Sequence, residues 1–121
     1  MIAIVNFKTY ENGTGAKALK LAKICESVAK KEKANIVLAV QTADLAMIAS
    51  KVSIPVLAQH VDAIEFGAHT GWTLPESIKE TGAIGSLINH SELNVPEQMI
   101  NEIIARCQEN YSGLVSLLKI A

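Results

Sequence analysis

The run Ile36-Val37-Leu38-Ala39-Val40 is apolar at every position, and the polar residues Gln41 and Thr42 follow it directly. A strand that is apolar throughout, rather than at alternate positions, is typical of a parallel sheet covered on both faces. Thr42 can cap a short helix that holds Leu45 and Ile48. This stretch therefore predicts one unit made of a buried strand, a polar strand end and a covering helix.

The same unit repeats on both sides of this run. Strands are predicted at 2–5, 36–40, 54–58, 83–88 and 114–118, the last of them directly after Gly113. Helices are predicted after Thr14, after Thr42, from Pro75 to a stop at Gly82, and after Pro96. Strands that alternate with helices in this way predict an α/β fold with right-handed crossovers and a parallel sheet.

Two of these helices show an apolar stripe at helical spacing. In the helix after Thr14 the stripe consists of Leu21, Ile24, Cys25 and Val28. In the last helix it consists of Met99, Ile100, Ile103, Ile104 and Cys107. We expect each stripe to mark one face of its helix.

Length and composition limit the classes of protein to consider. The 121 residues, half of them apolar, suffice for one domain with one core, which we place at 1–121. A net charge of -1 argues against nucleic-acid binding, and no apolar run approaches the ~18 residues that a membrane span needs. Residues 1–5 are too short for a signal-peptide core, and Cys25 and Cys107 fit buried thiols better than a disulfide, so we expect a cytoplasmic protein.

Two architectures fit this order of elements: an open doubly wound sheet, or part of a (β/α)₈ barrel. The segment 13–18 matches the dinucleotide pattern G-x-G-x-x-A, which would favour the open sheet. However, the polar residues 6–12 separate it from the first strand, and the second strand ends in Gln41 where a ribose-binding carboxylate would be needed. A glycine turn before a helix explains the pattern without a nucleotide.

The barrel explains where the polar residues lie, because chemistry in a (β/α)₈ barrel gathers at the carboxyl ends of the strands. Those ends carry Asn6-Phe7-Lys8, Gln41, Gln59-His60-Val61-Asp62 and Asn89-His90-Ser91-Glu92. The opposite ends, such as Lys33-Ala34-Asn35, are plain. This asymmetry is typical of a barrel enzyme.

Four motifs at these positions resemble triosephosphate isomerase in its short archaeal form. They are Asn6-Phe7-Lys8-Thr9-Tyr10, Ala58-Gln59-His60, Gly67-Ala68-His69-Thr70-Gly71 and Asn89-His90-Ser91-Glu92, in the family's order. The resemblance runs from Ile2 to about Gly113 and covers the N-terminal half of the barrel. It implies a partial TIM barrel of about four βα units plus a fifth strand.

The resemblance also implies an activity and a set of site residues. The family interconverts dihydroxyacetone phosphate and glyceraldehyde 3-phosphate in glycolysis and gluconeogenesis, without a cofactor. By match, Lys8 and His90 would be catalytic, and Asn6 and Phe7 would bind substrate together with Lys8. In the family this histidine is known to act as a neutral imidazole at a helix N-terminus, as an electrophile that polarises the carbonyl.

Further residues are implied in supporting positions. Glu92 and Gln59 would assist near the reacting groups, and Thr70 would reach into a neighbouring subunit, so a homo-oligomer, a dimer or a tetramer, is expected. His60, His69 and Asp62 match no standard metal-ligand spacing, and no metal is expected. Trp72 is expected to pack at an oligomer contact or under its loop.

The sequence also departs from the family. Leu93 and Asn94 stand where the family has arginine after the histidine motif. The family's general base, a glutamate after strand six, falls outside the 121 residues, so we expect little or no turnover by this chain alone. We also expect two open sheet edges that favour association.

Three alternatives remain at this point. The chain is a non-catalytic half-barrel assembly domain, a half-barrel that dimerises to bind phosphorylated sugars, or a fragment of a longer gene product.

Overall fold

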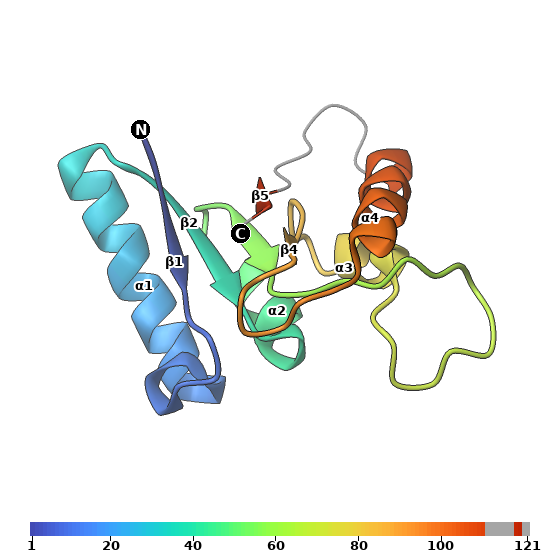
Figure 1. Cartoon of the computed structure of the whole chain (residues 1–121). Helices are drawn as coiled ribbons and strands as arrows, with labels where there is room; N and C mark the ends of the chain where they lie inside the picture. Colours follow the sequence, from blue (N-terminus) through green and yellow to red (C-terminus); the bar gives the residue numbers. More distant parts are fainter. Residues whose placement is uncertain (111–117, 120–121) are drawn as a thin grey trace.

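The chain folds as a parallel sheet with helices along one of its faces (Figure 1). The computed structural model describes residues 1–110 and 118–119. In chain order the elements are β1 (Ile2–Asn6), η1 (Glu11–Gly13), α1 (Gly15–Glu32), β2 (Asn35–Val40), α2 (Thr42–Ala49), β3 (Val56–Ala58), α3 (Pro75–Glu80), β4 (Leu87–Ile88), α4 (Glu97–Asn110) and β5 (Leu118–Lys119). The predicted alternation of strands and helices is confirmed.

Strands that follow one another in the sequence lie side by side, in a three-stranded sheet, β1-β2-β3, and a two-stranded sheet, β4-β5. β1 pairs in parallel with β2, and β2 with β3. A parallel bridge between Ala58 and Ser86 brings β4 alongside β3, and β4 pairs in parallel with β5. A doubly wound sheet reverses its strand order, whereas a barrel adds its strands consecutively. The strand order therefore confirms the partial barrel and rules out the open sheet.

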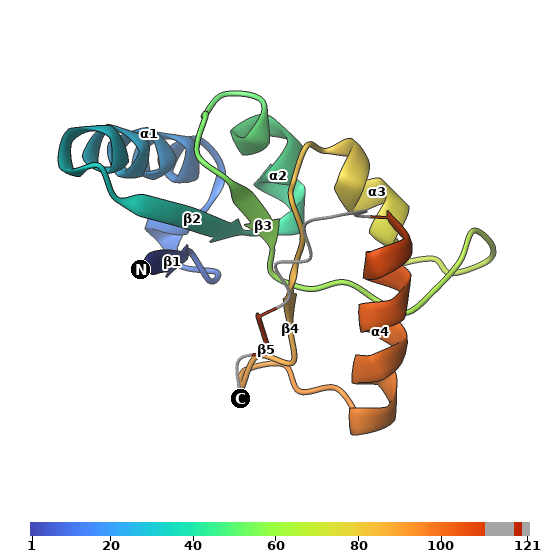
Figure 2. The ribbon, with the colours of Figure 1, turned by 90° about the horizontal axis from the view of Figure 1, so that it is seen from above.

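The helices cover the outer face of this curved sheet. Seen from above, α1, α2, α3 and α4 form an arc around the strands (Figure 2). The layer between sheet and helices is the main core, with Leu38, Val40, Val56 and Ile88 among its buried residues. The opposite, inner face has a smaller core of Ala39, Leu57 and Leu87. Because residue neighbours along a strand point to opposite faces, strands that are apolar throughout supply both cores.

The face by which α1 packs differs from the predicted one. Ala18, Ala22 and Ala29 are buried on this helix, while Ile24 and Val28 are 52% and 44% exposed. Small side chains let the helix axis approach the sheet closely, and the larger residues of the predicted stripe are left at its margin or in solvent. On α4 the predicted face is confirmed, since Ile100, Ile103 and Cys107 are buried.

Helix starts follow the sequence signals closely but not in every detail. Thr14 is the N-cap residue of α1, yet its hydroxyl donates to the carbonyl oxygen of Tyr10 and does not cap the helix. Thr42 is the first residue of α2 rather than its cap, because Gln41 takes that position. Pro75 begins α3 as predicted, and Gly82 follows it with a φ of +89°, which glycine adopts readily.

The fourth strand is shorter than predicted. The regular strand covers only Leu87 and Ile88, although Ile84 N–H donates to Val56 and Ala58 N–H donates to Gly85 along the same edge of β3. The fifth predicted strand, 114–118, lies mostly outside the described residues, and so does Gly113. The described strand there is β5.

Both cysteines are free thiols in the described structure. Cys107 is buried in α4, and this burial raises its pKa to about 11. Cys25 is partly buried in α1, and burial raises its pKa also. These positions match the predicted structural thiols. In the part of the chain that the structure describes, no helix is long and apolar enough to cross a membrane.

A buried carboxylate ties α1 to the segment that precedes β3. Glu26, only 8% exposed, accepts hydrogen bonds from the backbone N–H (2.6 Å) and the hydroxyl (2.7 Å) of Ser53. Lys23 donates to its other oxygen at 3.2 Å. These hydrogen bonds lower the pKa of Glu26 to about 2, with those from Ser53 contributing most.

The segment 63–72 forms a loop that is closed at its base. The backbone N–H of Asp62 donates to the carbonyl oxygen of Thr73 at 2.9 Å, and the N–H of Thr73 donates to Oδ2 of Asp62 at 2.7 Å. The loop extends away from the sheet and helices (Figure 1). Phe66 and Trp72 on it are 78% and 54% exposed.

Candidate active site

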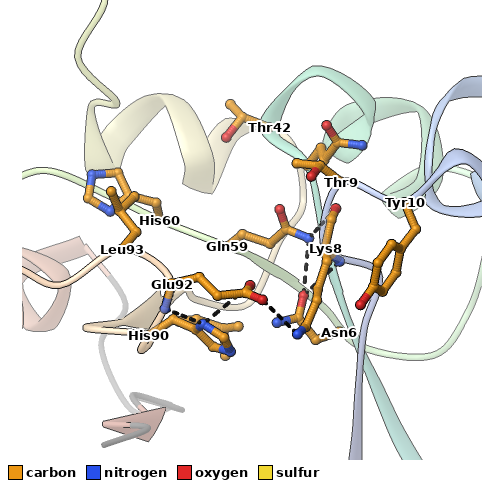
Figure 3. A pocket seen from close by; sticks show the side chains of 12 residues that line it. Asn6, Lys8, Thr9, Tyr10, Thr42, Gln59, His60, His90, Glu92 and Leu93 are labelled. Carbon is orange, nitrogen blue, oxygen red and sulfur yellow. Dashed lines mark hydrogen bonds and ion pairs between the residues drawn. The ribbon is translucent and has the colours of Figure 1, made fainter.

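A cavity of about 570 Å³ opens at the carboxyl ends of the strands (Figure 3). It is lined by Asn6, Lys8, Thr9, Tyr10, Gln41, Thr42, Gln59, His60, Leu87, His90, Glu92 and Leu93. Most of these residues directly follow β1, β2, β3 or β4 in the sequence. The parallel arrangement of the strands therefore brings four distant segments of the chain to one cavity.

Lys8 is the cation of this cavity, and it is held by a carboxylate. Its Nζ lies 2.7 Å from Oε1 of Glu92 and 5.9 Å from the centre of the Tyr10 ring. The hydrogen bond and the charge of Glu92 raise the pKa of Lys8. The hydrogen bond from Lys8 likewise lowers the pKa of Glu92. Both groups are therefore charged near neutral pH.

The backbone of Lys8 has a φ of 50°, in the left-handed region that residues other than glycine seldom adopt. Its N–H donates to Oδ1 of Asn6 at 2.9 Å. Because that oxygen accepts from the backbone, the Nδ2 group of Asn6 is the donor that this side chain can offer to a ligand.

Gln59, at the end of β3, joins the ends of β1 and β2. Its Nε2 lies 3.0 Å from the carbonyl oxygen of Lys8, 3.2 Å from Oδ1 of Asn6 and 3.3 Å from the carbonyl oxygen of Ala39. All three neighbours are acceptors, so the side-chain amide acts here as a donor.

His90 lies across the cavity from β1, after β4. Its Nδ1 accepts a hydrogen bond from the backbone N–H of Glu92 at 3.2 Å, so a neutral ring carries its proton on Nε2. The preceding Asn89 has a φ of 56°, and its Oδ1 accepts from Val95 N–H at 3.0 Å. We expected a helix N-terminus beside His90, but α4 begins only at Glu97. A turn that includes Glu92 supplies the N–H instead.

His60 is the second histidine that lines the cavity. Its Nε2 lies 2.8 Å from Oδ1 of Asp62, the same carboxylate that closes the base of the loop. The pair is a structural connection between the cavity and that loop. Among the described residues, no group of three or more histidine, cysteine or acidic side chains is arranged to hold a metal ion.

The structure brings together most of the predicted site residues. Asn6, Lys8, Gln59, His90 and Glu92 all line the cavity. Two others lie elsewhere. Phe7 is only 2% exposed and belongs to the core between sheet and helices, and Thr70 is exposed on the loop.

Sequence reasoning did not identify Tyr10, Thr42 or Leu93 as cavity residues. Tyr10 belongs to the motif Asn6-Phe7-Lys8-Thr9-Tyr10, and Thr42 directly follows the second strand. Because both lie at carboxyl ends of strands, the sequence could have predicted them as cavity residues. Leu93 was noted only as a departure from the family. It is 55% exposed and adds an apolar side chain to a mostly polar wall.

This arrangement can bind an anion and act on a carbonyl group beside it. Lys8 supplies a positive charge, Asn6 supplies an amide donor, and His90 supplies an imidazole in the tautomer that donates from Nε2. Consecutive parallel strands, outer helices and a polar cavity at the carboxyl ends of the strands define the class of this chain, which has the architecture of part of a (β/α)₈ barrel.

Comparison with known proteins gives the particular family. The family model described as triosephosphate isomerase matches residues 1–115. The chain belongs to the triosephosphate isomerase family. The predicted resemblance is thereby confirmed.

Similar proteins carry the same name. The triosephosphate isomerase of Methanobacterium bryantii is 57% identical over 94 residues, which cover 78% of this chain and 42% of the relative. That of Methanothermus fervidus is 47% identical over 109 residues, covering 90% and 49%. That of Archaeoglobus fulgidus is 46% identical over 117 residues, covering 97% and 52%. The chain spans about half the length of the curated relatives it matches.

Proposed function

We propose that this cavity is the carbonyl-polarising half of a triosephosphate isomerase site, which takes part in the interconversion of dihydroxyacetone phosphate and glyceraldehyde 3-phosphate. The observation that carries the proposal is the meeting of Asn6, Lys8 and His90 in one cavity of a chain from this family. No cofactor is required for this reaction, because it transfers a proton between adjacent carbons.

Each of the three residues has a distinct task. Lys8 attracts the dianionic substrate and offsets its charge. The Nδ2 group of Asn6 donates to a substrate oxygen. His90 donates from Nε2 to the carbonyl oxygen, where negative charge develops as the neighbouring carbon loses its proton.

The reaction also needs a base that removes a proton from carbon, and such a base typically contributes ~10²–10⁴-fold. Glu92 is the carboxylate of the cavity, but Lys8 holds it in an ion pair and lowers its pKa, which makes it a poor base. We therefore expect residues 1–121 by themselves to bind the substrate class but to turn over little of it.

The setting of the reaction is part of the proposal. The activity belongs to glycolysis and gluconeogenesis, and we place it in the cytoplasm. The exposed loop with Phe66, Thr70 and Trp72 is suited to contact a neighbouring subunit, which supports a homo-oligomer.

Ligand binding tests the site without requiring turnover. The chain is titrated with glycerol 3-phosphate, a triose phosphate analogue that lacks a carbonyl group, and the amide resonances of Lys8 and His90 are followed by NMR. We expect saturable shifts that glycerol alone does not produce. Lys8→Met should weaken binding about 10- to 100-fold, the worth of a charge-assisted hydrogen bond. No saturable shift would favour the non-catalytic assembly domain.

A chimera tests the chemistry. Residues 1–110 of this chain replace the matching segment of the Methanothermus fervidus enzyme, which is 47% identical over the aligned region. We expect the chimera to isomerise glyceraldehyde 3-phosphate, and His90→Gln within it to lower kcat by ~10²-fold or more. The matched control is Lys20→Gln, on the exposed side of α1. Equal effects of the two substitutions would contradict the role of His90.

A further inference from the structure

The left-handed backbone of Lys8 requires an explanation from its surroundings. A non-glycine residue in this region is unfavourable, and it persists only where neighbouring groups fix the chain. Lys8 N–H is fixed by Asn6 Oδ1 at 2.9 Å. That contact leaves the carbonyl side of Lys8 to be held by another group.

Gln59 is that group. Its Nε2 reaches the Lys8 carbonyl oxygen, the Asn6 oxygen that accepts from Lys8 N–H, and the Ala39 carbonyl oxygen, all within 3.3 Å. We propose that Gln59 is a positioning residue for Lys8, which holds the lysine backbone left-handed so that its ammonium group lies in the cavity. The inference deepens the proposed function and rests on it for its ligand-binding consequence.

The choice of amide follows from the three neighbours. All three are oxygen acceptors, so a side chain that donates fits among them. Ala39 O already accepts from Phe7 N–H and Asn6 Oδ1 from Lys8 N–H, so the Lys8 carbonyl oxygen is the acceptor that depends on Gln59. A carboxylate of the same shape would place a further acceptor among them. The three acceptors come from the ends of β1 and β2, and Gln59 itself follows β3. One side chain therefore connects the ends of three strands beside Lys8.

The position of the Lys8 ammonium group follows from that of its backbone. A change of φ at Lys8 from left-handed to extended redirects the side chain and separates Nζ from Glu92, which it now contacts at 2.7 Å. Loss of the Gln59 contacts should therefore be visible at Glu92, although Gln59 is not among the hydrogen-bond partners of Glu92.

The experiment compares Gln59→Glu and Gln59→Met with the unchanged chain by NMR, without ligand. The Lys8 Cα and Cβ shifts report the backbone conformation, and a titration of the Glu92 side-chain carboxyl reports the ion pair. We expect both variants to lose the left-handed shifts and to move the pKa of Glu92 upward, toward its ordinary value. Should Gln59→Glu fail to fold, Gln59→Met carries the test, because it adds no charge.

Gln41→Met is the matched control. Gln41 is also a rim amide, but its Nε2 donates to Gly13 and Thr14 and not to Lys8. We expect Gln41→Met to leave the Lys8 shifts and the Glu92 titration unchanged. Unchanged Lys8 shifts and Glu92 titration in the Gln59 variants, or an equal change in the control, would overturn the inference.

A double-mutant cycle separates positioning from general support. We expect Gln59→Met to weaken glycerol 3-phosphate binding, and to have no further effect once Lys8→Met is present. Additive losses would overturn the inference, since they would mean that Gln59 acts independently of Lys8. Absence of binding in the unchanged chain would instead count against the proposed function, while the ligand-free measurements would still decide the role of Gln59.

Discussion

His90 receives a hydrogen bond that selects one form of its ring. The backbone N–H of Glu92 can only donate, so Nδ1 must accept and the neutral ring must carry its proton on Nε2. A neutral imidazole that donates from Nε2 can polarise a carbonyl oxygen without itself carrying a positive charge. The turn that contains Glu92 therefore makes Nε2 the hydrogen-bond donor that His90 presents to the cavity.

The first prediction concerns this tautomer. In the neutral ring of His90, ¹⁵N NMR should show a protonated Nε2 and an unprotonated Nδ1. The exposed His69 serves as the control and should show the mixture of tautomers usual for a solvated ring. A protonated Nδ1 in neutral His90 would contradict the arrangement, because it would face the N–H of Glu92.

At this scale, the sequence predicted which residues gather but not how they contact one another. Asn6, Gln59 and His90 were found because parallel strands end at one edge. The contacts of Gln59 could not be predicted, since they depend on the register of three strands and on a left-handed residue at Lys8. Phe7 continues the alternation of β1, two residues after Val5, and packs in the main core, whereas the motif alone had placed it with the substrate.

Helix α1 is attached to the rest of the fold by a buried carboxylate. Oε1 of Glu26 accepts from both the backbone N–H and the hydroxyl of Ser53, and the pKa of Glu26 is about 2 in the folded chain against an ordinary value of 4.5. A carboxyl whose pKa is lowered by folding stabilises the fold above its unfolded-state pKa. That contribution is lost as the pH falls from about 4.5 through about 2.

The second prediction follows from this sign. Glu26→Gln should lower the urea midpoint of unfolding at pH 7, and the difference from the unchanged chain should shrink steadily as the pH falls below the ordinary carboxyl range. The control is Glu102→Gln on the exposed side of α4, for which we expect little difference in midpoint at any pH. A constant gap for Glu26→Gln across the pH range would contradict the assigned role of its charge.

The third prediction tests which helix faces are buried. Ile103 on α4 is 1% exposed and Ile24 on α1 is 52% exposed. Ile103→Val should lower the free energy of unfolding by ~0.5–1.5 kcal/mol, while Ile24→Val should change it by less than about 0.5 kcal/mol. Denaturant titrations of both variants measure this. Equal losses would mean that Ile24 is covered in solution.

Helices and strands could be predicted where a single sequence feature determined them. Continuous apolar runs identified the strands, and Pro75 marked the start of α3. The buried face of α1 was missed because the prediction followed the large side chains, whereas three alanines allow the close approach to the sheet. The fourth strand was predicted too long, since an apolar run shows burial but not how much of it is regular.

At the scale of the whole molecule, strand β1 lies at an edge of the described sheet, where another chain could pair with it. In the part of the chain that the structure describes, β1 is paired along one side, with β2, and Ile2 on it is 65% exposed. Unpaired, apolar strand edges are templates for pairing with other chains. We therefore keep self-association as an expectation for residues 1–121.

The fourth prediction places a charge on that edge. Ile2→Lys should lower the average mass that sedimentation detects at high protein concentration, because lysine on an edge strand opposes strand addition. Ser27→Lys, on the exposed side of α1, is the control for added charge and should leave the mass unchanged. A monomer in the unchanged chain at every concentration would contradict the expectation.

The closed base of the loop at 63–72 has a practical consequence. Asp62 and Thr73 are joined by two hydrogen bonds, so both ends of the loop are held by the fold itself and not by the loop's own composition. Ile64, near the start of the loop, is buried, and its carbonyl oxygen accepts from Arg106, so this residue belongs to the fold. Residues 65–72 should therefore be exchangeable. Peptides of other lengths and sequences, grafted in their place, would be displayed from a fixed anchor while the rim that holds Lys8 and His90 keeps its geometry.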